Sequence, residues 1–497
     1  MTRYGPLLRG GRAAAAVLVV VGWISALALV CASDGVTRSP AALQRSQATV
    51  TIDGAFPALP PHPLSDVFRV PVTVPGSYPM SLTAAVGGRQ VKASWIYVDG
   101  MPGLNSHLDS WLLSILDNLA APAGGRYRPS MAVNASRLPG PALTVSAEPV
   151  LAAGTVIVVR EETIEVRADS TRSESSATIY ADTVSGEVRR GVELLRPESL
   201  NGIRAKVTGV PAGIAGPPSQ GPGLTDVVLD STGEVHIIEQ GNAGPGQSGR
   251  HEMTTITAIE ADAMLSDVGR KVLGQLRAAP VSPPAVAPAL RHVNCDVVPC
   301  AALSYDDGPD ARTTPQLLAI LREKNAKATF FMTGSNTTAN PAIARQVADA
   351  GHSIGNHTFG HPYLTKLTPA AVRTEMDRAD AAIRAATGSA PSLMRPPYGA
   401  ADAGVQAAVG KPLIFWAVDS LDWQSKNPAV FIPKILREIS PGAVVLMHDV
   451  DPTTIAGQQE LITNLQAQGY RLVTVPQMFE GTPLVSGHVY RARPERK

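Results

Sequence analysis

Short apolar runs alternate with amphipathic stretches through the last two-fifths of the chain. The apolar runs are Ala301–Tyr305, Ala328–Met332, Leu413–Ala417, Val444–Met447 and Leu472–Val475. Helical patterns such as Pro369–Ala386 and Ile455–Gln468 lie between them. Strands that alternate with helices favour a parallel sheet, either open or barrel-like. In barrels of this type the reactive groups collect at the C-terminal ends of the strands. We therefore predict an α/β domain here.

The middle of the chain has a different pattern. Six apolar residues follow one helical stripe: Leu108, Trp111, Leu112, Ile115, Leu116 and Leu119. The β-type segments Thr155–Arg160, Ile164–Ala168 and Ser176–Asp182 follow, and then a hairpin of Val227–Leu229 and Val235–Ile238 turns around Asp230–Gly233. A helix is expected at about Glu260–Leu276. These elements predict a small α+β domain, in which His236 and His251 are isolated and are interpreted as structural.

The linkers set the predicted domain boundaries. Residues Ala278–Pro288 read AAPVSPPAVAP, a stiff spacer. The length of 497 residues also favours two or three domains. The predicted segments are a signal or anchor at 1–32, a tether with short strands at 33–94, the α+β domain at 95–277, the linker at 278–292, the α/β domain at 293–482 and a tail at 483–497.

The N-terminus has the pattern of an export segment. Arg3, Arg9 and Arg12 precede the run Ala13–Ala32, which contains no charge. A basic flank followed by an apolar run is typical of a secretory signal, and the run is also about as long as a membrane-spanning helix. A cleaved signal ending near Ala32 and a retained membrane anchor both remain open. Either one predicts a protein outside the cytoplasmic membrane, in the cell envelope.

Charge and cysteine content narrow the classes of partner. The 43 basic and 42 acidic residues leave a net charge of +1, so no basic field is available to hold a nucleic acid. Of the three cysteines, Cys31 lies in the export segment, and Cys295 and Cys300 have the spacing C-x4-C. In an exported protein this pair is interpreted as a disulfide. The sequence carries no signal for an oligomeric state.

Two polar clusters have the residue types of a catalytic metal site. In SYDDGP, 304–309, Asp306 and Asp307 end a strand, where adjacent side chains point to different sides, so one can hold a metal while the other handles a proton. The alternative is an ordinary Asp-Gly turn. In NHTFGH, 356–361, His357 and His361 have the spacing of one helical turn, which suits zinc. The alternative is a pair of surface histidines.

Three further clusters follow in order. In RPPYG, 395–399, the prolines stiffen a loop that can present a backbone N–H to a developing negative charge, and Arg395 can orient a carboxylate. The alternative is a rigid turn. VDSLDW, 418–423, comes directly after a predicted strand. LMHD, 446–449, ends another strand, and there His448 is a candidate general acid or a structural histidine.

The order and spacing of these five clusters resemble the NodB-homology polysaccharide deacetylases, carbohydrate esterase family 4, from about Cys295 to about Phe479. The resemblance implies a distorted (β/α) barrel and a divalent metal, zinc first, with cobalt or manganese also accepted. It implies these roles: Asp306 as base, Asp307, His357 and His361 as metal ligands, Arg395 orienting the base, Tyr398 giving an N–H to the oxyanion, His448 as acid, Asp422 tuning that acid, and Trp423 and Leu446 lining the acetyl pocket. The first motif of the family commonly begins Thr-Phe, whereas this one begins Ser304-Tyr305.

The resemblance implies hydrolysis of N-acetyl groups on the amino sugars of an envelope polysaccharide, with peptidoglycan as the first expectation. O-acetylated xylan and chitin-type chains are alternatives, because fold alone does not select among them. Another alternative is a non-catalytic envelope protein, but every proton-transfer and metal position is present. The choice between GlcNAc and MurNAc stays open. The middle region loosely resembles domains that precede some envelope deacetylases, and we expect it to position substrate or to act as a spacer.

Overall fold

The computed structural model describes residues 72–135, 142–166, 172–208, 224–240, 251–281, 283 and 291–496. All of them belong to one compact unit, which begins at Pro60. The predicted export segment Ala13–Ala32 and the first part of the predicted tether lie outside the described residues. In the described part of the chain no helix is both long and apolar enough to cross a bilayer.

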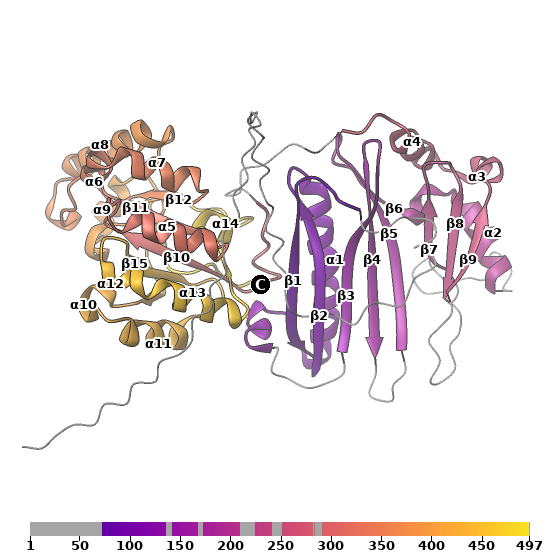
Figure 1. The fold of residues 1–497 in the computed structure, drawn as a ribbon, viewed down its shortest axis with the longest axis horizontal. Coiled ribbons are helices and arrows are strands. Elements are labelled where there is room, and N and C mark those ends of the chain that lie inside the picture. The colour runs from indigo at the N-terminus through magenta and orange to yellow at the C-terminus, as the bar shows by residue number, and fades with distance from the viewer. Residues whose placement is uncertain are drawn as a thin grey trace, which may run out of the picture. The chain divides into compact units, whose positions relative to one another are not determined.

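The first part of the fold is a six-stranded sheet with one long helix (Figure 1). Its elements are β1 Ser77–Val86, β2 Arg89–Val98, α1 Pro102–Ala120, β3 Ala142–Ala153, β4 Val156–Val166, β5 Arg172–Asp182 and β6 Val188–Arg190. The strands lie in chain order, and only β2 and β3 run parallel. The predicted apolar stripe forms α1, where Leu108, Leu112 and Leu116 are buried against the sheet. The pattern of the middle region therefore predicted this helix correctly.

A three-stranded sheet follows, with α2 Pro197–Thr208, β7 Leu224–Leu229, β8 Val235–Gln240, β9 His251–Ile256, α3 Ala258–Met264 and α4 Asp267–Leu276. The predicted hairpin is formed by β7 and β8. The predicted single helix Glu260–Leu276 is wrong, because the chain breaks into α3 and α4. Ser266 causes the break: its hydroxyl accepts a hydrogen bond from the Gly269 N–H and caps the new helix.

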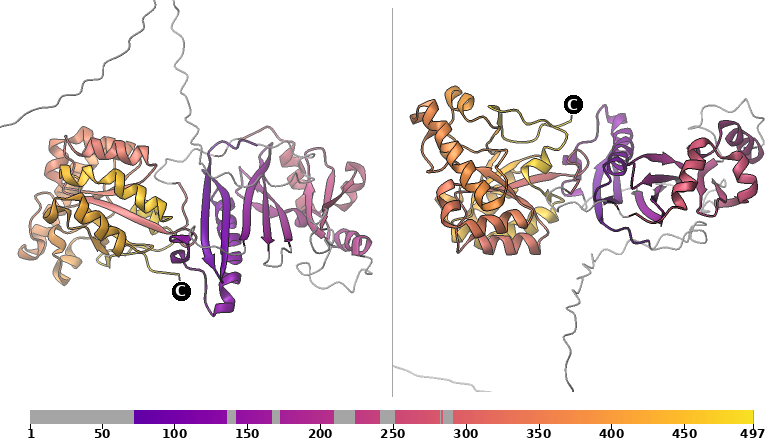
Figure 2. Two further views of the ribbon diagram at one scale, coloured as in Figure 1. Left: turned by 60° about the horizontal axis from the view of Figure 1, so that its bottom comes forward. Right: turned by 90° about the horizontal axis from the view of Figure 1, so that it is seen from above.

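The C-terminal part is a mostly parallel sheet surrounded by helices (Figure 2). Its strands are β10 Cys300–Asp306, β11 Ala328–Met332, β12 Ser353–Asn356, β13 Leu413–Ile414, β14 Val418–Asp419, β15 Val444–His448, β16 Arg471–Leu472 and β17 Val489–Tyr490. Its helices are α5 Thr314–Glu323, α6 Gly334–Ala339, α7 Pro341–Asp349, α8 Pro369–Thr387, α9 Ala403–Ala408, α10 Asp422–Ser425, α11 Pro428–Glu438, α12 Pro452–Ala456, α13 Gln458–Ala467 and α14 Val475–Met478. The predicted α/β class is confirmed.

The sheet order is β12-β11-β10-β15-β14, and β16 also pairs with β10. Every residue of β10 and β11 is buried, as expected for strands that are covered on both faces. Met394 links β12 to β13 through single-residue bridges. No ladder closes the ring among the described residues, so the expected barrel is not found as a closed one. The predicted helix Ile455–Gln468 is likewise interrupted, at Gly457 between α12 and α13.

Candidate active site

The polar clusters of the C-terminal domain meet where its parallel strands end. Asp306 is the last residue of β10, and His448 is the last residue of β15. These two residues are direct partners in the parallel ladder. On the other side of β10, the end of β11 pairs with Asn356, which directly precedes His357. The carboxyl ends of neighbouring strands thus bring three of the five clusters to one edge.

Asp307, His357 and His361 form a compact group of ligand atoms. Asp307 Oδ1 lies 3.5 Å from His357 Nε2 and 3.2 Å from His361 Nε2. One ligand atom of each residue lies within 4.8 Å of the others. Metal–ligand bonds of about 2.0–2.1 Å in tetrahedral geometry would separate neighbouring ligand atoms by about 3.3 Å. The donor set and its spacing therefore fit a divalent metal such as zinc.

The hydrogen bonds behind the two histidines direct their rings toward this point. His357 Nδ1 lies 2.7 Å from the backbone oxygen of Arg395. A carbonyl oxygen only accepts, so Nδ1 carries the proton and leaves the Nε2 lone pair for a metal. His361 Nδ1 lies 3.1 Å from the Tyr398 hydroxyl. His357 and His361 thus each have a hydrogen-bond partner at Nδ1, on the side of the ring away from Asp307.

The loop from His357 to His361 is not the helical turn expected from the spacing. Thr358 and His361 have φ values of 64° and 59°, in the left-handed region. Asp307 also has a positive φ, 75°, and the Asn336 side-chain amide donates to its backbone oxygen at 2.7 Å. The predicted helical turn is therefore wrong. Residues with left-handed backbone bring the two imidazoles together, and the pattern of hydrophobic and polar residues does not reveal such a conformation. Such strained residues cluster at functional sites.

The electrostatics of the triad favour binding of a cation. Burial alone would raise the pKa of Asp307, but the hydrogen bond to His357 and the positive charge that either imidazole carries when protonated lower it to about 2. The Asp307 carboxylate is therefore charged at neutral pH. Burial lowers the pKa of His361, which favours the neutral imidazole that a metal would need.

Asp306 is held by a buried arginine. Arg395 Nη1 donates to Asp306 Oδ1 at 2.7 Å, and the arginine side chain is fully buried. The same guanidinium donates to the Ser304 hydroxyl at 2.8 Å and to the backbone oxygens of Ile414 and Phe415. Burial lowers the pKa of Arg395, but its ordinary value is so high that it stays charged. Asp306 Oδ2 is left facing His357 Nε2, 3.7 Å away.

His448 is paired with Asp422. His448 Nδ1 lies 2.9 Å from Asp422 Oδ1, and the His448 backbone N–H donates to Oδ2 at 2.8 Å. The hydroxyls of Thr454 and Ser420 also donate to this fully buried carboxylate, at 2.6 and 2.9 Å. Burial would lower the pKa of His448, but the hydrogen bond and charge of Asp422 raise it to about 9. The imidazole is therefore protonated at neutral pH, as a general acid must be.

Of the three remaining predicted site residues, two are exposed and one is buried. Tyr398 lies in the one-turn 3-10 helix Pro397–Gly399 with φ 60°, and its side chain is 56% exposed. Trp423 is 53% exposed at the start of α10, whereas Leu446 in β15 is buried and pairs in register with Ser304. The role of Trp423 in the acetyl pocket stays a prediction.

Several residues that contact the site were not identified from the sequence. Asn336 supports the Asp307 backbone, and Thr454 supports Asp422. Asp449 is fully buried, accepts a hydrogen bond from Thr314, and has a pKa that burial raises to about 7. Its place in LMHD, directly after His448, was the only available signal. Hydrogen-bonding residues of this kind carry no distinctive spacing.

The departure at the start of the first motif has a structural explanation. The Ser304 hydroxyl donates to the Val445 backbone oxygen at 2.6 Å and accepts from Arg395. The buried Tyr305 hydroxyl donates to Gln458 Oε1 at 2.6 Å, behind the site. Both polar groups are therefore satisfied, so the motif keeps its geometry.

Cys295 and Cys300 are joined by a disulfide with Cα atoms 5.4 Å apart. Cys300 is the first residue of β10, so the bridge lies at the opposite end of the strand from Asp306. The disulfide therefore holds the N-terminal end of β10 and does not contact the candidate active site at its C-terminal end.

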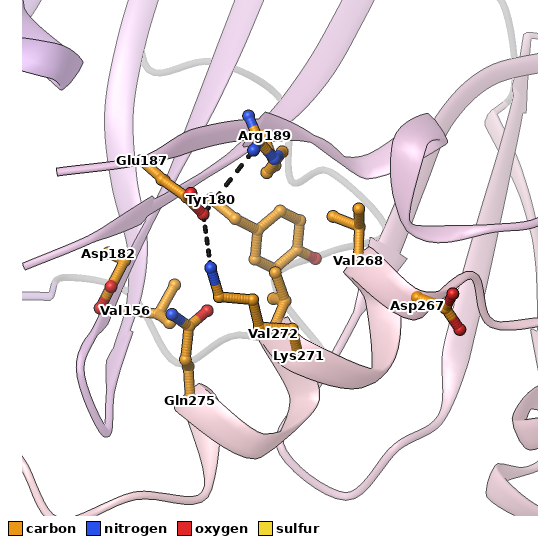
Figure 3. Close-up of a pocket in the computed structure, with 10 residues that line it drawn as sticks. All are labelled: Val156, Tyr180, Asp182, Glu187, Arg189, Asp267, Val268, Lys271, Val272 and Gln275. Atoms are coloured by element: carbon orange, nitrogen blue, oxygen red, sulfur yellow. Dashed lines mark hydrogen bonds and ion pairs between the residues drawn. The ribbon is translucent and has the colours of Figure 1, made fainter. Parts of the chain in front are cut away.

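Two other polar groupings lie in the middle domain. A cavity of about 240 Å³ has Tyr180 and Val272 in its wall, and Glu187 in that wall lies 2.7 Å from Lys271 (Figure 3). Asp230, Glu234 and His236 form a second possible metal group among the described residues. Asp230 Oδ1, however, accepts three backbone N–H groups of its own hairpin turn. Turn geometry accounts for that carboxylate, and neither grouping contains an acid–base pair like that of the strand ends.

The comparisons with known proteins concern the C-terminal domain. The sequence profile of the polysaccharide deacetylase family matches residues 294–411. The peptidoglycan-N-acetylglucosamine deacetylase PgdA of Listeria monocytogenes is 39% identical over 189 residues, 38% of this chain and 40% of the relative. A peptidoglycan-N-acetylglucosamine deacetylase of Bacillus cereus is 34% identical over 186 residues, 36% of this chain and 68% of the relative. The chain thus spans about two-fifths of the length of the Listeria protein.

Among solved structures, a T48 deacetylase with substrate is 39% identical, with a TM-score of 0.39 over 40% of this chain and 99% of that chain. The family profile covers the first three of the five clusters, SYDDGP, NHTFGH and RPPYG. The chain therefore belongs to the NodB-homology polysaccharide deacetylase family, carbohydrate esterase family 4.

Proposed function

We propose that the chain removes N-acetyl groups from amino sugars of peptidoglycan, with a divalent metal held by Asp307, His357 and His361. The observation that carries the proposal is the pairing of Asp306 with His448 at neighbouring strand ends. One is a carboxylate held by an arginine, and the other is a protonated imidazole held by a carboxylate. A base and an acid beside a metal triad are the groups that amide hydrolysis requires.

A divalent metal bound at the triad would supply Lewis-acid activation of the acetyl carbonyl and of a water molecule. Asp306 acts as the base in this proposal. Its Oδ1 is occupied by Arg395, so Oδ2, on the His357 side, is the oxygen available to accept a proton from water. The buried guanidinium fixes the orientation of the carboxylate. Asp306 is therefore positioned as a base rather than as a fourth ligand.

His448 delivers a proton to the leaving nitrogen. Its Nδ1 proton is held by Asp422, so the Nε2 proton is the one that can be transferred. An amine is a very poor leaving group as an anion, so cleavage of an amide needs such an acid more than cleavage of an ester does. The raised pKa of His448, about 9, keeps this acid protonated at neutral pH.

Tyr398, Trp423 and Leu446 complete the proposed site. The stiff Pro-Pro segment ahead of Tyr398 can present its backbone N–H to the oxygen that gains negative charge. Trp423 and Leu446 would contact the acetyl methyl. These roles rest on the family motifs, and the exposure of Trp423 is compatible with a side chain that meets substrate from solvent.

The choice of peptidoglycan rests on two supports. The Listeria and Bacillus relatives are peptidoglycan-N-acetylglucosamine deacetylases, and the segment Ala13–Ala32 is predicted to direct export. An envelope location, by cleaved signal or by anchor, is part of the proposal. Acetate release should be compared on peptidoglycan, GlcNAc oligomers and acetylated xylan. Release from xylan alone would refute N-deacetylation. Mass spectrometry of the digested wall with and without the gene would identify the deacetylated sugar as GlcNAc or MurNAc.

The assignment of the base has a direct test. Asp306→Asn should abolish acetate release while the protein keeps its bound metal, because the three ligands are untouched. Asp349→Asn, which alters only an exposed ion pair on α7, is the matched control and should behave as wild type. Acetate release by Asp306→Asn at the wild-type rate would refute the proposed mechanism.

A further inference from the structure

A row of side chains leads outward from the metal triad. The His361 ring contacts the Tyr398 ring with centroids 4.6 Å apart. Tyr398 stacks on Tyr363 at 3.9 Å with an interplanar angle of 12°. The Lys366 Nζ lies 4.7 Å from the centroid of the Tyr363 ring. The row therefore connects a proposed metal ligand to a cation at the surface.

The outer members of this row are exposed, although most of the aromatic side chains described are buried. Tyr398 and Tyr363 are 56% and 43% exposed, despite stacking on each other. Two stacked, exposed aromatic rings beside the candidate active site offer a face on which a ligand can pack. We call Tyr363 and Tyr398 the aromatic platform.

The platform is held in place by the chain around it. Residues 364–366 form a one-turn 3-10 helix, in which the Lys366 N–H donates to the Tyr363 backbone oxygen at 3.0 Å. Leu364, between them in sequence, is fully buried and packs against Met376 and Met394 in one apolar cluster. Burial of Leu364 fixes the turn, so Tyr363 and Lys366 both remain at the surface. The surface is therefore preformed rather than a mobile loop end.

The chemistry of this surface matches a particular kind of sugar. An aromatic ring offers an apolar face to the C–H groups of a pyranose, and its hydroxyl offers a hydrogen bond. Lys366 has no ion pair among the described residues, so its ammonium group is available for an anion. Chitin-type chains are neutral, whereas the muramic-type sugars of peptidoglycan carry a carboxyl-bearing substituent.

From this arrangement we propose that the aromatic platform with Lys366 binds a sugar next to the reacting one and favours a neighbour that carries a carboxylate. The inference rests on the proposed deacetylase function and deepens it. In this proposal Lys366 distinguishes carboxylate-bearing from neutral glycans, and Tyr363 binds the glycan. Neither residue belongs to the acid–base or metal groups.

The charge is tested with Lys366→Met, which keeps the aliphatic stem over the Tyr363 ring. KM should be measured on a neutral GlcNAc oligomer and on a peptidoglycan fragment of equal length that carries carboxylates. The variant should raise KM for the fragment about fivefold more than for the oligomer, the upper end for one exposed charge pair, with kcat kept. Arg373→Ala, which removes another exposed cation from α8, is the control. An equal change on both substrates, or no change, overturns the role of Lys366.

The platform is tested with Tyr363→Ala and Tyr363→Phe. The alanine variant should raise KM roughly tenfold on both substrates, whereas phenylalanine, which keeps the ring, should stay close to wild type. Metal content is measured in parallel. Loss of metal in Tyr363→Ala would mean that the ring acts only by supporting Tyr398 and His361, and would overturn the binding role.

Failure of this inference can be told apart from failure of the proposed function. Glycan binding is measured by calorimetry on Asp306→Asn, with and without Tyr363→Ala, so it does not depend on turnover. Weaker binding with Tyr363→Ala supports the platform even if no acetate is released by the wild type. Equal binding by both proteins overturns the platform even if the wild type is an active deacetylase.

Discussion

The Asp422–His448 pair makes a prediction about how activity depends on pH. The carboxylate accepts both the Nδ1 proton and the backbone N–H of His448, and it raises the pKa of the imidazole from about 6.5 to about 9. A difference of about 2.5 pKa units corresponds to roughly 3 kcal/mol that favours the protonated ring. The His448 side chain is only 17% exposed, so solvent screens this interaction little. Asp422 thus keeps the acid protonated.

Asp422→Asn should therefore move the alkaline limb of kcat/KM for acetate release to lower pH. The acid is active below its pKa and is lost as pH rises through it, so lowering the pKa removes activity from the alkaline side only. Asp306 and Asp307 still favour the imidazolium, so we expect a shift of about two units rather than the full difference. The variant should lose roughly tenfold at pH 8 and little at pH 6.

The assay is a pH–rate profile of both proteins with the same metal. A bound cation would shift both profiles in the same direction, so the quantity tested is the difference between them. Asn also leaves one of the donors to the carboxylate without an acceptor, which should lower the free energy of unfolding by about 1–3 kcal/mol. Thermal melting and metal content show whether the variant is folded. A folded, metal-loaded Asp422→Asn with an unmoved alkaline limb would refute the reasoning.

Three further predictions concern Arg395, the proposed metal group and the disulfide. Arg395→Met leaves the buried Asp306 carboxylate without its partner, so it should lower the free energy of unfolding by about 3–5 kcal/mol and abolish acetate release. Urea titration measures the stability, and a variant as stable as wild type would contradict the ion-pair argument. His361→Ala should lose the metal. Tyr398→Phe removes the hydroxyl behind His361 and should weaken metal affinity by at least about tenfold, as measured by competition with a chelator. Equal affinity of Tyr398→Phe and wild type would show that this hydroxyl does not support His361. Replacing Cys295 and Cys300 with serine should lower the free energy of unfolding by about 2 kcal/mol, because the disulfide closes a short loop with a sequence separation of 5. The value of kcat should not change, since the disulfide lies at the opposite end of β10 from Asp306. A loss of kcat without a loss of stability would contradict this prediction.

The strands β10, β11 and β15 were predictable because they are almost wholly buried. The predicted strands Leu413–Ala417 and Leu472–Val475 were too long, because β13 ends at Ile414 and β16 ends at Leu472. Ala328–Met332 was predicted with the bounds that β11 has, and every residue of that strand is buried. Continuous apolar runs bounded by polar clusters leave few other assignments. Breaks in helices were not predictable from the same pattern. Apolar residues continue past Ser266, and the break depends on a single hydroxyl that caps α4.

The two adjacent aspartates show where inference from residue types ends. Their place after a strand indicated that Asp306 and Asp307 need not share a role, but which one is the base came only from the resemblance. The backbone separates them physically. Asp306 completes the extended strand, so its side chain points inward to Arg395. Asp307 turns into the left-handed region at φ 75°, which directs its carboxylate to the two histidines. The change from extended to left-handed backbone between Asp306 and Asp307 therefore directs two carboxylates of the same type to different partners. Neither composition nor residue spacing reveals such a change.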